Sequence, residues 1–139
     1  AVEVLQASGH PEIRANHKTT LEITKDTRVT RKGDCIVAVS ASKGAADLSP
    51  ELSRLLKNDS TRVTITIRAA GRTATVTGRG DRRLTLTHPS DLVARKSNYV
   101  CNRTVMVEAD KSASDLSREF VRTLRDPSSE ITVQLAAEL

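Results

Sequence analysis

Aromatic residues are almost absent from this 139-residue chain, which contains one Tyr, one Phe and no Trp. The core must therefore consist mainly of Val, Leu, Ile and Ala. Sequence-tolerant binding of single-stranded nucleic acid usually depends on stacked aromatic side chains, so only recognition of the phosphate backbone is left open. A chain of this length can bury a core of its own without a metal or a disulfide. We expect a single domain over residues 1–139.

Cysteine is also scarce, and Cys35 and Cys101 do not form a CxxC pair. This spacing is not typical of a secreted disulfide framework. Two buried thiols are the simpler interpretation, and a disulfide between them is left open. No apolar span or secretory signal is visible in the sequence. The sequence thus predicts a cytoplasmic protein without a membrane partner.

Positive charge is in modest excess, with 22 Lys and Arg against 17 Asp and Glu. Mixed charge of this kind is typical of a soluble surface with mild attraction for anions. The expected partners are an anionic small molecule or nucleic acid. Basic residues at predicted loops or strand starts are Arg31, Lys32, Arg79, Arg82, Arg83, Arg95, Lys96 and Arg103.

One segment of the sequence occurs twice in similar form. Residues 37–67 match residues 105–135 at about 13 of roughly 31 positions, far more than chance allows, which indicates an internal duplication. Two copies are too few for a solenoid. We therefore expect two repeats, 1–68 and 69–139, related by an approximate two-fold axis.

Each repeat shows the same pattern of elements. Apolar residues alternate over several stretches, which is the period of a strand with one buried face. Ser49 and Ser117 are suited to cap a short helix in each repeat, whose apolar side chains share one face. The predicted strands are 2–9, 19–24, 35–41 and 62–70 in the first repeat, and 73–80, 82–87, 103–109 and 130–139 in the second.

With about eight strands and two short helices, the chain is predicted to be mainly β. Each half has the order β-β-β-α-β. A closed, pseudo-two-fold β-barrel would remove the sheet edges economically. An α+β arrangement of two packed sheets is the alternative.

The two repeats differ in one place. The predicted second strands of the two repeats are 63 positions apart in the sequence, and the predicted third strands are 68 positions apart. The second repeat is therefore predicted to hold about five extra residues between these strands, within 88–100. Loops on a rigid scaffold often carry function. The first repeat has a comparable polar stretch, 9–18, before its second strand.

The polar segments 9–18 and 88–103 contain all three histidines. If the segments meet, they would form a basic pocket for an anion, with His available for proton transfer near neutral pH. Separate surface histidines are the alternative. The candidate ligand-binding residues are His10, Arg14, His17, Lys18, His88, Asp91, Arg95, Lys96 and Arg103.

Lys43 and Lys111 form a weaker pair of candidates. Each precedes a predicted helix start, where free N–H groups favour anions, although Asp47 and Asp115 are suited to occupy the same donors. No metal-ligand spacing, P-loop or nucleophile elbow is present. No cofactor, metal or catalytic residue is therefore predicted.

The Gly-Asp turn at 33–34, directly before a predicted strand, resembles the Gly-Asp box of the cradle-loop barrels, which also arise by duplication. A second Gly-Asp, at 80–81, precedes a different strand. The runs GHPEIRANHKTTLEITKD, GDCIVAVSASKGAADLSPEL, LTLTHPSDLVARKSNYVCNRT and DKSASDLSRE resemble a small family of archaeal proteins of unknown function. This resemblance covers nearly the whole chain and implies a cytoplasmic protein, with no established activity and no catalytic residues to carry over.

Three functions are compatible with these observations. The preferred one is a binding protein for a phosphorylated small molecule or a nucleic-acid backbone, through the two polar segments. The second is an enzyme that uses His17 or His88 as general acid or base, with Arg14, Arg95 or Lys96 stabilising the substrate anion. The third is an assembly module that forms a homo-oligomer through sheet edges or helices.

Overall fold

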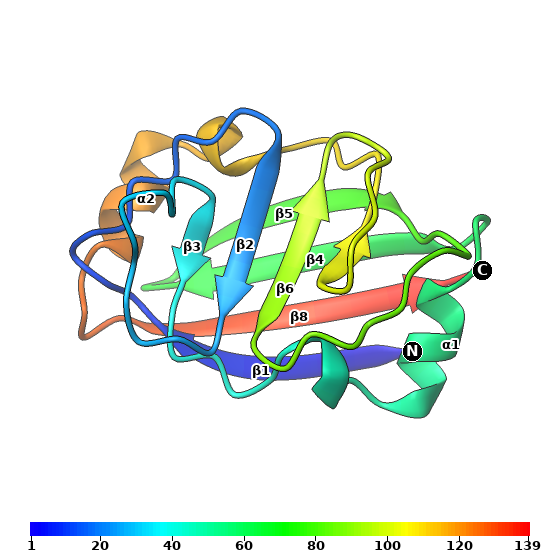
Figure 1. Cartoon of the computed structure of the whole chain (residues 1–139). Helices are drawn as coiled ribbons and strands as arrows, with labels where there is room; N and C mark the ends of the chain where they lie inside the picture. The colour runs from blue at the N-terminus through cyan, green and yellow to red at the C-terminus, as the bar shows by residue number, and fades with distance from the viewer.

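The computed structural model describes residues 1–139 and consists of two four-stranded β-sheets with two short helices (Figure 1). Sheet A is antiparallel throughout and has the strand order β1-β8-β4-β5. Its strands are β1 (Val2–Ser8), β4 (Arg62–Ala69), β5 (Arg72–Arg79) and β8 (Glu130–Glu138).

Sheet B has the order β3-β2-β6-β7, with β2 and β6 antiparallel at its centre and each outer strand parallel to its neighbour. Its strands are β2 (Thr20–Thr24), β3 (Ile36–Ala38), β6 (Asp91–Arg95) and β7 (Thr104–Met106). The edges of the two sheets meet only at single bridges, Ser8 with Val39 and Arg79 with Val107. The chain is thus mainly β with two sheets, and the expected closed barrel is not found.

The two helices lie at opposite ends of the molecule (Figure 1). The hydroxyl of Ser49 accepts a hydrogen bond from the backbone N–H of Leu52, and that of Ser117 from the N–H of Phe120, so both predicted caps are confirmed. Neither helix has the length and apolar character needed to cross a membrane. The helical segments are η1 (Ala45–Asp47), α1 (Pro50–Leu56), η2 (Ala113–Asp115) and α2 (Arg118–Leu124).

An aliphatic core fills the space between the sheets. Alternate side chains of β4 and β8 are buried, as their sequences predict. Leu56 of α1 and Leu124 of α2 are fully buried in the same cluster. One continuous core therefore joins both halves of the chain.

The two halves contain the same elements in the same order. Equivalent residues are 71 positions apart as far as the second strand, where Thr20 corresponds to Asp91. They are 68 apart from the third strand onward, where Ile36 corresponds to Thr104.

The second strand of the second half differs from its prediction. Residues 82–87 form a loop, and the strand β6 lies at Asp91–Arg95, within the segment predicted as an insertion. Leu84 and Leu86 are buried at alternate positions, which imitates a strand, but Leu86 has a φ of 54°, outside the β region. The prediction of extra residues in the second half is therefore wrong, because the loop 25–35 is three residues longer than its counterpart 96–103.

Candidate functional site

The two polar segments do not form one pocket containing all three histidines. His17 lies just before β2 and His88 just before β6. Because these strands are antiparallel over five residue pairs, the two histidines lie at opposite ends of a ladder about 17 Å long.

His17 and His88 occupy equivalent positions and make equivalent contacts. Nδ1 of His17 accepts hydrogen bonds from the backbone N–H groups of Thr19 and Thr20, at 3.2 and 3.1 Å. Nδ1 of His88 accepts from Ser90 and Asp91, at 3.1 and 2.9 Å. Each ring therefore fixes the turn that leads into a strand of sheet B.

Arg14 joins two loops of the first half. Its Nε donates to Asp34 Oδ1 at 2.7 Å, and its Nη2 donates to the carbonyl groups of Thr30 and Arg31, both at 2.9 Å. His10, in the same segment, accepts a hydrogen bond from the N–H of Glu12. Arg14 thus holds the loop 25–35 against the segment 9–18.

Several predicted residues meet on the outer side of sheet B, in a group that we call the Arg103 cluster (Glu22, Thr24, His88, Asp91 and Arg103). Nη1 of Arg103 donates to Glu22 Oε1 at 2.8 Å and to Asp91 Oδ2 at 2.9 Å. The Thr24 hydroxyl donates to Asp91 Oδ1 at 2.7 Å, and His88 Nε2 lies 3.7 Å from Asp91 Oδ2. The two carboxylates are buried, with 6 % and 7 % of their residue surface exposed.

Glu22 is a member of this cluster that the sequence did not reveal. Burial is the largest cause that raises the pKa of its carboxyl, to about 7, and repulsion from Asp91 is the next; Arg103 opposes this shift. The only signal in the sequence is a Glu at the outward position of the strand TLEIT, which ordinarily indicates exposure to solvent. Contacts with Cys35 and Arg103, from the loops before β3 and β7, are what cover it.

Two thiols adjoin the Arg103 cluster; both are free, and both are half-buried where the sequence predicts buried thiols. Burial and the Glu22 carboxylate raise the pKa of Cys35 to about 11. For Cys101, partial burial acts in the same direction, but hydrogen bonds from the Arg103 backbone, Thr104 and Arg95 lower the pKa to about 7. Nη2 of Arg95 lies 3.3 Å from Cys101 Sγ. The Cys101 thiol is therefore the more readily ionised of the two near neutral pH.

The remaining predicted lysines have different partners. Lys96 Nζ lies 2.7 Å from Asp115 Oδ2. Lys43 Nζ lies 2.8 Å from Glu3 Oε2, so the anion that Lys43 binds is a carboxylate of the same chain. Lys111 Nζ donates to the carbonyl of Thr75 at 2.6 Å and forms no ion pair with a carboxylate.

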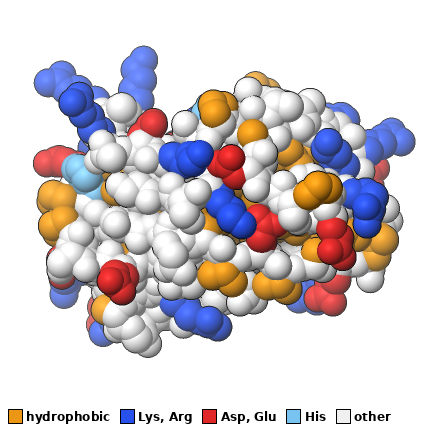
Figure 2. Space-filling view, turned by 90° about the horizontal axis from the view of Figure 1, so that it is seen from below, with side chains coloured by type: hydrophobic (Ala, Val, Ile, Leu, Met, Phe, Trp, Pro, Cys, Tyr) orange, Lys and Arg blue, Asp and Glu red, His pale blue; other side chains and the backbone are white.

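One end of the molecule carries basic side chains that lack a carboxylate partner. We call this group the basic end; its members are exposed and lie on the segment 9–18 and the loop 25–35. Figure 2 shows Lys and Arg side chains standing out at the left end of the molecule, where these loops lie in Figure 1. The members of the basic end are Lys18, Arg28, Arg31 and Lys32.

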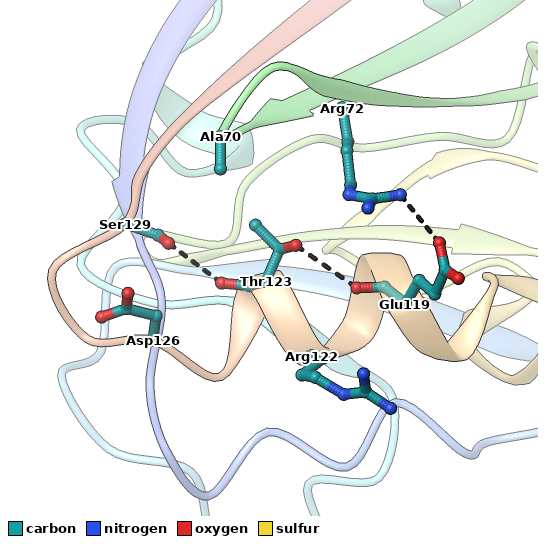
Figure 3. A pocket seen from close by; sticks show the side chains of 7 residues that line it. All are labelled: Ala70, Arg72, Glu119, Arg122, Thr123, Asp126 and Ser129. Atoms are coloured by element: carbon teal, nitrogen blue, oxygen red, sulfur yellow. Dashed lines mark hydrogen bonds and ion pairs between the residues drawn. The ribbon is translucent and has the colours of Figure 1, made fainter.

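A pocket of about 390 Å³ lies between α2 and the β4–β5 turn (Figure 3). Its polar side chains bond mainly to neighbouring groups, as Arg72 does to Glu119 at 2.9 Å and Ser129 does to the carbonyl of Thr123. Arg122 lies on the opposite side of α2 from Arg72 in this view. None of the predicted ligand-binding residues lines this pocket.

Residues 5–138 match a protein family described as a domain of unknown function, DUF371. The chain belongs to this family. It is also 43 % identical, over 123 residues, to the uncharacterized protein MJ0206 of Methanocaldococcus jannaschii, an alignment that covers 88 % of this chain and 90 % of that protein. The resemblance to an archaeal family of unknown function is confirmed, and DUF371 membership assigns no activity to any residue of this chain.

Proposed function

We propose that this DUF371 protein binds a phosphate-rich anion, in particular a nucleic-acid backbone, through the basic end. The observation that supports the proposal is the grouping of Lys18, Arg28, Arg31 and Lys32, which are exposed and have no carboxylate partner, on two loops that Arg14 holds together. Cations without a partner in the protein are available to neutralise phosphates and release their counterions.

The lack of aromatic residues sets the mode of binding. Tyr99 is exposed, but its ring lies 4.8 Å from the Arg95 guanidinium, and no other exposed aromatic side chain can stack on a base. Binding would therefore be directed to the backbone, tolerant of sequence and strongly dependent on salt.

The other predicted ligand-binding residues enter this proposal in different ways. Arg14, His10 and His17 shape the loops that carry the basic end. His88, Asp91, Arg95 and Arg103 belong to or adjoin the Arg103 cluster, and Lys96 is paired with Asp115. These five residues are proposed to position sheet B and its loops.

The proposal is tested by fluorescence anisotropy with a labelled 20-nucleotide single strand over a range of salt concentrations. The triple variant Arg28→Gln, Arg31→Gln, Lys32→Gln is expected to bind at least tenfold more weakly at low salt. Each lost phosphate contact lowers the slope of log K against log salt by about 0.7 for a single strand.

A matched control removes the same charge elsewhere. Arg54, Arg62 and Arg68 are exposed and lack a carboxylate partner, but lie on α1 and sheet A. Their triple change to Gln should weaken binding less than about threefold, because only long-range attraction is lost. Equal weakening by both triple variants, or no binding by the natural protein at low salt, would refute a localised site.

The acid–base alternative rests on His17 and His88. His88 has Nδ1 bonded to the backbone and Nε2 directed towards Asp91, which suits a structural role. His17 uses only Nδ1, so its Nε2 is the ring nitrogen available for proton transfer. His17 lines none of the pockets of the structure.

We also infer that the two halves descend from one duplicated segment. The repeated segment and the common order of elements support this inference. In each half the repeated segment forms the helical cap, the apolar helix face and the last strand, which are needed for folding. Differences between the halves are therefore the better guide to sites.

A further inference from the structure

Glu3 of β1 places a carboxylate in a small site of the first half. Its Oε2 lies 2.8 Å from Lys43 Nζ, and its Oε1 accepts a hydrogen bond from the backbone N–H of Ser49 at 2.8 Å. Only 12 % of the Glu3 side chain is exposed. Burial alone would raise the pKa of this carboxyl, but the bonds from Lys43 and Ser49 lower it, so the carboxylate is ionised at neutral pH.

The second half repeats the surroundings of this carboxylate. Lys111 and Ser117 stand 68 positions after Lys43 and Ser49. The neighbouring ion pairs are repeated as well, since the pair Lys25–Asp47, at 2.8 Å, has its counterpart in Lys96–Asp115, at 2.7 Å.

The carboxylate itself is missing from the second half. The residue equivalent to Glu3, 71 positions later, is Ala74 on β5. Lys111 donates to the Thr75 carbonyl instead, and the N–H of Ser117 has no acceptor within the protein. A pocket of about 370 Å³ lies here, with Ala74, Lys111, Ser117 and Phe120 in its wall.

We propose that this pocket binds the carboxylate of a small aliphatic acid, in the position that the Glu3 carboxylate occupies in the first half. Lys111 and the Ser117 N–H would each bond one carboxylate oxygen, as Lys43 and Ser49 do. Leu116 and Phe120 offer an apolar wall to the aliphatic chain. The pocket is larger than a carboxylate group, so it has room for that chain. This proposal is independent of the basic end and uses none of its residues.

The test follows amide signals of ¹⁵N-labelled protein by NMR during titration with propionate. The Ser117 amide is expected to shift and to saturate, while the Ser49 amide stays in place because Glu3 already occupies its site. In Ala74→Glu the built-in carboxylate should abolish the propionate response of Ser117. Lys111→Met should weaken binding at least tenfold.

Glu3→Ala provides the matched control, and it does not depend on the folding of Ala74→Glu. This change should open a second site, so that the Ser49 amide now also shifts with propionate. The proposal is refuted if Ser117 does not respond to propionate in the natural protein, if 1-propanol or inorganic phosphate shifts Ser117 as strongly as propionate, or if a folded Ala74→Glu variant responds unchanged.

Discussion

At the scale of single residues, the Arg103 cluster places two buried carboxylates on one guanidinium. If Glu22 and Asp91 were both ionised, the group would carry net negative charge away from water, which is costly. Glu22 accordingly retains its proton to higher pH, with a pKa of about 7. The cluster thus couples the stability of sheet B to pH near neutrality.

Glu22→Gln tests this coupling. Folding raises the pKa of Glu22, so its contribution to the free energy of unfolding is fully present below about pH 4.5. As the pH rises towards 7, the free energy of unfolding falls by about 2–3 kcal/mol because the buried carboxyl loses its proton. The variant should therefore gain stability relative to the natural protein between pH 4.5 and 8, as measured by urea unfolding followed by circular dichroism. Glu130→Gln, at an exposed site, should show no such change, and a pH-independent difference for Glu22→Gln would contradict the assignment.

Some features of single residues follow from the sequence, and others do not. Ser49 and Ser117 were predicted as caps because a cap depends on a few neighbouring residues. The burial of Glu22 depends on Cys35 and Arg103, which lie distant in sequence. The separation of His17 from His88 likewise depends on the pairing of β2 with β6, which local pattern does not determine.

At the scale of elements, the loop 82–87 shows why alternation alone is an insufficient signal for a strand. Leu84 and Leu86 are buried like the side chains of a strand. Ile13 and Ala15 are their counterparts in the first half, and Ala15 has a φ of 49°, close to the 54° of Leu86. Both loops pack two apolar side chains into the core and then turn at the histidine that leads into the next strand.

His88→Asn and His88→Leu test the role of this turn. Asn has an oxygen that can accept the bonds made to Nδ1, as Asn does in helix caps, so His88→Asn should lose less than about 1 kcal/mol. Leu leaves the N–H groups of Ser90 and Asp91 without that acceptor, at a cost of about 1–3 kcal/mol. Urea unfolding measures both, and His17 should show the same contrast. Equal losses for Asn and Leu would indicate that packing of the ring, and not Nδ1, is what matters.

At the scale of the whole molecule, the two halves are interleaved. β1 and β4 of the first half both pair with β8 of the second, β4 also pairs with β5, and β2 pairs with β6. Within a single half, the ladders are limited to the short parallel contacts β2–β3 and β6–β7. The sequence predicted two similar halves, but pairing between them is non-local and does not follow from their pattern.

This interleaving predicts that neither half folds alone. A fragment 1–68 would lose every partner strand of β1 and β4, and β2 would keep only its short contact with β3. Most of its strand donors and its apolar faces would be left in water, and 69–139 would be affected in the same way. Each fragment should therefore lack cooperative urea unfolding by circular dichroism, whereas an equimolar mixture should recover the β spectrum and a single transition. The intact chain should unfold in one transition for the same reason. Independent cooperative folding of either fragment as a monomer would show that pairing between the halves is not what stabilises the sheets.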